Sequence, residues 1–278
     1  MRILGCFLLL VAAVGASPDA VNRANALYQR TEYENSLHIL AQDPAPDAAT
    51  HLLTGKNYFM LGDYKRAIEF FEKISPASSE SELWLGRAWG RRAEGGSPFA
   101  IVYATRTHQY FEKAIALDPH NREAKNDLFD FYLNAPGILG GGIEKAEAAA
   151  KSIAAERPAE SELEEAQIAE KRNDFTAAEM HMRRSMELAP AEPGRVVDLA
   201  RFVAKRGRLE ESDRLFAQAM KLAPGRPATA FAEARINIEN HRNLEQARKL
   251  LQDYLRASLT PDDPTRQEAE KLLKRAGG

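Results

Sequence analysis

A five-residue segment recurs in this chain at a distance that constrains its fold more than any other feature. Met-Glu-Leu-Ala-Pro at residues 186–190 returns as Met-Lys-Leu-Ala-Pro at residues 220–224, which is 34 residues later. Weaker copies of the surrounding pattern run through most of the sequence. A period of this length is typical of arrays in which each helix pair buries its apolar face only against neighbouring pairs. The sequence therefore predicts an all-α solenoid of antiparallel helix pairs.

Within each copy, small and large residues follow a fixed order, and a proline closes the copy. The best copy consists of Gly55, Tyr58, Gly62, Asp63, Tyr64, Ala67, Phe71 and Pro76. The next best consists of Ala200, Val203, Gly207, Leu209, Ser212, Phe216, Ala219 and Pro224. This order resembles the tetratricopeptide repeat, and about seven copies cover about residues 19 to 257. The resemblance implies a right-handed α-solenoid.

The small residues have a packing rationale. Gly55 and Gly86 lack side chains, so the first helix of a unit can approach the second closely. Aromatic residues such as Phe71 and Phe111 are expected to fill the gap toward the next unit. Gly62 falls where the chain turns between two helices, a place where a positive φ is expected.

Residues 1–16 differ in composition from the rest of the chain. An arginine precedes an apolar run at residues 3–14, and small residues follow up to Ala16, which is the pattern of a cleaved secretory signal peptide. Cys6 is the single cysteine, so cleavage after Ala16 would leave no disulfide and no thiolate. We expect a periplasmic or secreted protein. The expected organisation is a signal peptide, a repeat array, and a capping helix with a tail, at residues 1–16, 17–257 and 258–278.

The charge balance argues against two classes of partner. The chain has 38 lysine and arginine residues against 40 aspartate and glutamate residues, a net charge of −2. Nothing in this balance steers it to nucleic acid or to an anionic membrane. No apolar run after residue 16 reaches the roughly 18 residues that an integral membrane span requires. The six histidines are scattered, and no phosphate loop or nucleophile motif occurs. We expect no metal, no cofactor and no enzymatic activity.

The tetratricopeptide resemblance implies where a partner would bind. In that family the first helix of each unit lines a concave groove, whose outward positions meet a peptide or a partner helix. The matching positions here are Asn25, Lys56, Phe59, Arg87, Arg91, Asp130, Asn134, Gln167, Arg201 and Lys205. Family members that clamp a terminal carboxylate use a lysine followed four residues later by an asparagine. No matching pair in this sequence reproduces that clamp.

Two insertions interrupt the period and indicate a second candidate surface. Residues 93–100 and 134–142 are both expected to be loops between the two helices of a unit, on the same edge of the array. Apolar residues in such loops are expected either to pack against the array or to contact a binding partner. The loop-edge candidates are Phe99, Ile138 and Leu139.

Three functional classes follow from these observations. The leading hypothesis is a non-enzymatic scaffold of the bacterial envelope that binds a protein or peptide in the groove or along the loop edge. The second is a structural array that associates with copies of itself through Phe99 and Ile138. The third is an enzyme whose catalytic residues converge from distant repeats.

Overall fold

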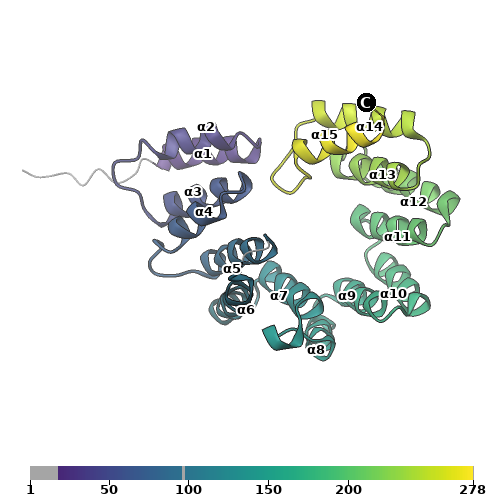
Figure 1. Cartoon of the computed structure of the whole chain (residues 1–278), viewed down its shortest axis with the longest axis horizontal. Helices are drawn as coiled ribbons and strands as arrows, with labels where there is room; N and C mark the ends of the chain where they lie inside the picture. The colour runs from purple at the N-terminus through teal and green to yellow at the C-terminus, as the bar shows by residue number, and fades with distance from the viewer. Residues whose placement is uncertain (1–17, 96–97, 278) are drawn as a thin grey trace, which may run out of the picture.

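The chain folds entirely into helices in a computed structural model that describes residues 18–95 and 98–277 (Figure 1). The predicted signal peptide lies outside these residues. The first fourteen α-helices of the described part pair consecutively, and α15 follows them. The helices are α1 (Pro18–Gln29), α2 (Tyr33–Leu40), α3 (Ala48–Met60), α4 (Tyr64–Phe71), α5 (Ser79–Glu94), α6 (Ala100–Leu117), α7 (Arg122–Asn134), η1 (Gly137–Leu139, a 3-10 helix), α8 (Ile143–Ile153), α9 (Pro158–Lys171), α10 (Phe175–Leu188), α11 (Pro193–Lys205), α12 (Leu209–Leu222), α13 (Pro227–Glu239), α14 (Leu244–Arg256) and α15 (Arg266–Arg275). The predicted solenoid of helix pairs is confirmed.

The turn inside a pair is encoded by a glycine and a capping residue. Gly62 has φ of 78°, and Gly207 at the equivalent turn has φ of 75°, so both occupy the region that favours glycine. Asp63 follows Gly62 and caps α4, because its side chain accepts a hydrogen bond from the Arg66 backbone N–H at 3.0 Å. The positive φ predicted for Gly62 is confirmed.

The small residues let the two helices of a pair touch. A Cβ added at Gly55 would lie 2.6 Å from Phe71 Cδ1, and one at Gly86 would lie 2.5 Å from Phe111 Cδ1. The prediction that these rings fill the gap toward the next unit is therefore incomplete, because each ring lies over the glycine of its own unit. Phe71 does reach the next unit as well, where its ring centroid is 6.1 Å from that of Trp84.

Ion pairs join successive units in the C-terminal half. Arg172 pairs with Glu147 at 2.6 Å, Arg208 with Glu179 at 2.5 Å, and Arg242 with Asp213 at 2.5 Å. Each pair joins the second helix of one unit to the turn of the next unit. In the N-terminal half, aromatic packing also joins successive units, as between Phe59 of α3 and Trp84 of α5, whose centroids are 5.1 Å apart.

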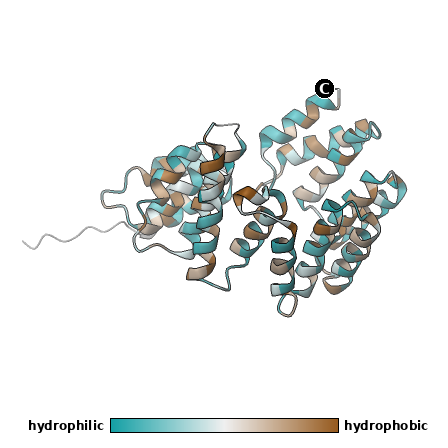
Figure 2. Ribbon diagram, turned by 60° about the horizontal axis from the view of Figure 1, so that its bottom comes forward, coloured by the Kyte–Doolittle hydropathy of each residue, from teal (hydrophilic) through white to brown (hydrophobic). Residues whose placement is uncertain are grey.

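The array curves until its two ends approach each other (Figure 1). Helices α5, α7, α9, α11 and α13 lie on the inner side of the curve, and their even-numbered partners lie on the outer side. The turn that precedes α15 points toward α1 and α3. Hydrophobic and hydrophilic residues alternate along the helices, as expected when one face of each helix packs and the other meets water (Figure 2). The concave inner wall is the frame of the candidate site.

Candidate functional site

In the N-terminal half of the groove, the predicted cations pair across neighbouring units. Lys56 on α3 forms an ion pair with Glu80 of α5. Arg87 Nε on α5 donates to Asp127 Oδ2 on α7 at 2.6 Å, and Arg87 Nη2 lies 2.9 Å from Glu123 Oε2. Lys56 and Arg87 therefore hold units together before any partner binds.

The middle of the groove is rich in carboxyl groups. Asp130 on α7 is exposed to solvent, yet desolvation by the surrounding wall, together with Asp127 and Glu160, raises its pKa to about 6. Glu164 on α9 is 3% exposed, and its Oε2 has no hydrogen-bond partner among the described residues. Burial, reinforced by Glu160, raises the pKa of Glu164 to about 8. Glu164 is therefore mostly neutral at pH 7.

The C-terminal half of the groove holds cations that lack partners. Arg201 and Lys205 on α11 make no ion pair and no hydrogen bond through their side chains with any residue that the structure describes. Together with Gln167 on α9, they line a cavity of about 360 Å³. Its apolar walls include Leu163, Phe202 and Ile236. Glu170, Asp198 and Glu239 also line it, so the cavity combines acidic, apolar and cationic surface, and Arg201 and Lys205 are cations there without an ion pair.

The other predicted groove residues have different environments. Asn25 on α1 is exposed. Phe59 is half-buried and packs edge-on against neighbouring aromatic rings, so it serves inter-unit packing rather than an open wall. Arg91 Nη1 donates to Glu94 at 3.0 Å. Asn134 donates to the Asp130 carbonyl oxygen at 3.0 Å.

The first insertion connects two helices as predicted, but the connection is shorter than residues 93–100. Helix α5 continues to Glu94 and α6 already begins at Ala100, so only the residues between them form the connection. The longer helix ends pack on each other, since Arg92 Nη2 donates to the Tyr103 hydroxyl at 2.8 Å. Phe99 precedes α6 and is 60% exposed.

The second insertion folds into η1, which packs against α6. Ile138 is 92% exposed, whereas Leu139 is half-buried. Ile101 and Val102 at the start of α6 are also exposed. The structure therefore leaves apolar side chains exposed on both insertions.

Comparison with solved structures places the fold. A tetratricopeptide repeat protein from Parabacteroides merdae ATCC 43184 aligns with 94% of this chain and 98% of its own, with a TM-score of 0.58 and 11% identity. The chain has the tetratricopeptide-repeat fold.

Two further tetratricopeptide-repeat structures are similar. A thermophilic protein from Thermus thermophilus aligns with 68% of this chain and 98% of its own, with a TM-score of 0.50 and 20% identity. The C-terminal part of a repeat-containing protein from Cytophaga hutchinsonii aligns with 91% of this chain and 99% of its own, with a TM-score of 0.48 and 15% identity. No protein-family model and no curated protein matches the chain. At such identities the likeness shows the fold alone, so function has to be inferred from the residues of this tetratricopeptide-repeat array.

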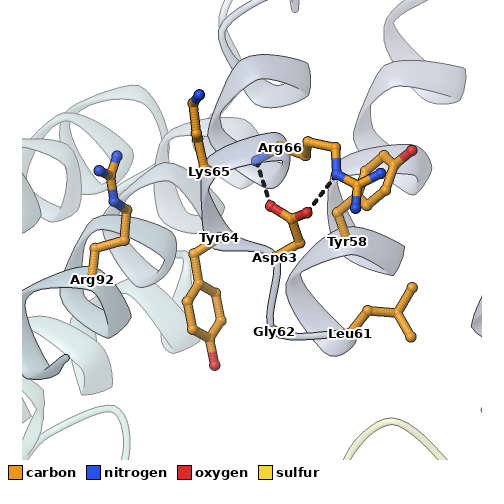
Figure 3. Close-up of a pocket in the computed structure, with 8 residues that line it drawn as sticks. All are labelled: Tyr58, Leu61, Gly62, Asp63, Tyr64, Lys65, Arg66 and Arg92. Carbon is orange, nitrogen blue, oxygen red and sulfur yellow. Dashed lines mark hydrogen bonds and ion pairs between the residues drawn. The ribbon is translucent and has the colours of Figure 1, made fainter.

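The array has another hollow on its turn edge, where the α3–α4 turn meets the end of α5 (Figure 3). Its volume is about 470 Å³, and Tyr58, Tyr64 and Arg92 help to line it. The guanidinium of Arg66 lies 4.4 Å from the Tyr58 ring centroid and donates from Nε to Asp63 at 2.5 Å. Arg66 is thus paired within its own unit, unlike Arg201.

Two histidines of the repeat array lie close to carboxylates. His108 is 3.4 Å from Glu112, and His181 is 2.7 Å from Glu162. No group of three or more metal-binding side chains comes together within residues 18–95 and 98–277. Across the same residues, no helix has both the length and the apolar character needed to cross a membrane.

The meeting of the two ends of the array is not predictable from the repeat pattern. Tyr28 and Gln29 of α1 line the same cavity as Pro261 and Asp262 of the turn before α15. These residues are more than 200 positions apart, and the curvature of all the units together brings them close. No local sequence signal carries that information.

Proposed function

We propose that this tetratricopeptide-repeat protein is a non-enzymatic scaffold that holds an extended segment of a protein partner in its concave groove. The observation that carries the proposal is the pair of cations without an ion pair, Arg201 and Lys205, in a cavity whose walls are partly apolar and partly charged. Natural peptide grooves use apolar contacts for affinity and charged contacts for orientation. An amphipathic segment with an acidic group would satisfy both parts of this wall.

The pairing pattern supports the C-terminal half as the contact region. A partner that used Lys56 or Arg87 would first have to break an ion pair between units, which costs part of the binding energy. Arg201 and Lys205 carry no such cost. Contacts along the rest of the groove then serve to guide the segment.

The test compares two charge reversals of equal size. Arg201→Glu with Lys205→Glu changes the groove, and Arg214→Glu with Lys221→Glu changes exposed cations on the outer helix α12. The wild-type chain is used as bait in an envelope fraction, and the affinity of each captured protein is then measured for both variants. We expect the groove variant to lose about tenfold or more in affinity and the outer variant to stay within about twofold. Equal retention by the two variants would contradict the groove proposal.

The export part of the proposal rests on residues 1–16. Their apolar run and small residues favour cleavage after Ala16 and a location in the periplasm or outside the cell. An envelope partner is the corresponding expectation.

Self-association through the loop edge is the second candidate function. Ile138 is 92% exposed, and Ile101 is 65% exposed. Exposed apolar patches of this kind commonly mark interaction sites. Sedimentation at rising protein concentration should show a dimer that Ile138→Asp abolishes; a monomer at all concentrations would remove this candidate.

A further inference from the structure

The cavity where the two ends of the array meet has the features of a binding site. Its volume is about 470 Å³, within the range of pockets that hold small ligands or single side chains of a partner. Its walls come from α1, α3, α5 and the start of α7 on one side and from the turn before α15 on the other. A ligand bound there would touch both ends of the chain at once.

Carboxylates are the more accessible charges in this cavity. Two cations, Lys56 and Arg87, line it together with three acids, Glu80, Glu123 and Asp262. The cation side chains are only 19% and 23% exposed, whereas the Glu80 and Glu123 side chains are 51% and 67% exposed. Both cations are already paired with carboxylates, and Arg87 also engages Asp127, which lies outside the lining set. An entering group therefore meets negative charge first.

Asp262 is the acid at this site that has no partner. Its carboxylate makes no ion pair and no hydrogen bond within the described residues, and it is exposed on the turn. The turn itself is held firmly, because Asp263 accepts hydrogen bonds from Thr260 N and Oγ1, at 2.9 and 3.0 Å. Leu259 anchors the same turn in the core and is 4% exposed. The position of Asp262 is thus fixed without using its charge.

A tyrosine on the opposite wall, buried except where its hydroxyl meets the cavity, supplies an independent sign of a ligand. Tyr28 is 6% exposed and lines the cavity, yet its hydroxyl has no hydrogen-bond partner in the described part of the chain. Burial raises the pKa of Tyr28, and Tyr33 and Asp262 raise it further. Burial together with Asp262 also raises the pKa of Tyr33 to about 12. The Tyr28 hydroxyl is thus open to the cavity and available to hydrogen-bond a ligand that enters it.

We propose that this cavity binds a cationic side chain, lysine or arginine, of a bound segment, with Asp262 as the ion-pair partner and the Tyr28 hydroxyl as a hydrogen-bond acceptor. An ammonium or guanidinium group carries several donors, which suits a carboxylate on one wall and a hydroxyl oxygen on the other. The aliphatic stem would pack on Met60 and on the half-buried Trp84. That the cation belongs to a protein segment rests on the proposed scaffold function. That the cavity binds a cation does not depend on it.

The experiment uses short probes and the full chain. Acetyl-Gly-Arg-Gly-amide is titrated into the ¹⁵N-labelled protein and followed by chemical-shift changes, with norleucine and glutamate tripeptides as matched probes. We expect saturable binding of the arginine probe in the millimolar range. The norleucine and glutamate probes should bind at least about fivefold more weakly.

Three variants locate the site. Asp262→Asn should lower the affinity for the arginine probe about fivefold to tenfold. Tyr28→Phe should lower it about threefold, because this variant keeps the ring packing and loses only the hydroxyl. Glu270→Gln removes an exposed charge from α15 outside the cavity and should leave affinity within about twofold. Circular dichroism establishes that each variant is folded. The proposal is overturned if norleucine or glutamate binds as well as arginine, if Asp262→Asn binds like wild type, or if no probe binds. None of these results depends on Arg201 or Lys205, so failure here leaves the scaffold proposal standing.

Discussion

Two glycines of the same helix should respond differently to alanine. Gly86 and Gly90 both lie within α5, and neither has a positive φ, so alanine gains up to about 1 kcal/mol of helix propensity at either position. A Cβ at Gly86 would lie 2.5 Å from Phe111 Cδ1, whereas one at Gly90 would lie 3.5 Å from Thr107 Cγ2. Because carbon atoms rest at about 3.5–4.0 Å, only the first substitution creates an overlap.

The difference between the two variants isolates the packing cost. Overpacking a closely fitted site costs about 1–3 kcal/mol. Since the propensity gain is common to both, Gly86→Ala should be less stable than Gly90→Ala by about 1–3 kcal/mol. Gly90→Ala should equal wild type or exceed it by up to about 1 kcal/mol. Urea denaturation, followed by far-UV circular dichroism, measures the unfolding free energy of both variants. We expect the dependence of that free energy on urea concentration to be the same for both.

A double-mutant cycle with Phe111→Leu shows whether the ring is the cause. The smaller side chain leaves room beside Gly86. The loss of unfolding free energy caused by Gly86→Ala should therefore be smaller by at least about 1 kcal/mol in the Phe111→Leu background than in wild type. Equal stability of the two glycine variants, or an absence of coupling to Phe111, would refute the proposed contact between glycine and ring.

Three further predictions concern titration, ion pairs and export. Glu164 has a native pKa of about 8 against an ordinary value of 4.5, so the native state loses stability as pH rises from about 4.5 to about 8. Glu164→Gln should therefore resemble wild type near pH 4.5 and exceed its unfolding free energy by on the order of several kcal/mol at pH 8, measured by urea denaturation at both values; a constant difference across pH would contradict this. Arg242→Ala, which removes the bidentate pair with Asp213, should cost about 0.5–1 kcal/mol in the same assay, whereas Arg256→Ala, from an exposed pair within α14, should cost close to nothing; equal costs would argue against the role of the inter-unit pairs. N-terminal sequencing of the protein recovered from the periplasm of an expressing bacterium should begin at residue 17, and an uncleaved chain would refute the export proposal.

The sequence predicts features that arise within one repeat. The close approach of two helices at Gly86 and the positive φ of Gly62 both follow from the repeat pattern, whereas the pattern assigned the Phe111 ring to the next unit and missed its contact with Gly86. The predicted bounds of the loop at residues 93–100 are too wide for a related reason. Ala93, Glu94 and Ala100 are compatible with helix, and the period alone cannot tell a loop insertion from two lengthened helices.

Features that join distant units are not predictable in the same way. The repeat register suggests that Lys56 and Arg87 line the groove, but not that each pairs with an acid of the next unit. The cavity between Tyr28 and Asp262 depends on small rotations summed over the whole array. Which groove residues remain available to a partner is therefore a property of the folded array.

Photo-crosslinking from single positions tests whether a partner lies in the groove. A benzoylphenylalanine is placed at Gln167 on the inner helix α9, at Gln218 on the outer helix α12, or at Ile138 on the loop edge, and each chain is irradiated with a captured partner. Gln167 lines the cavity beside Arg201, whereas Gln218 is exposed on the outer helix. The groove proposal predicts a crosslinked product from Gln167 and none from Gln218. Crosslinks from Gln218 or Ile138, with none from Gln167, would contradict it.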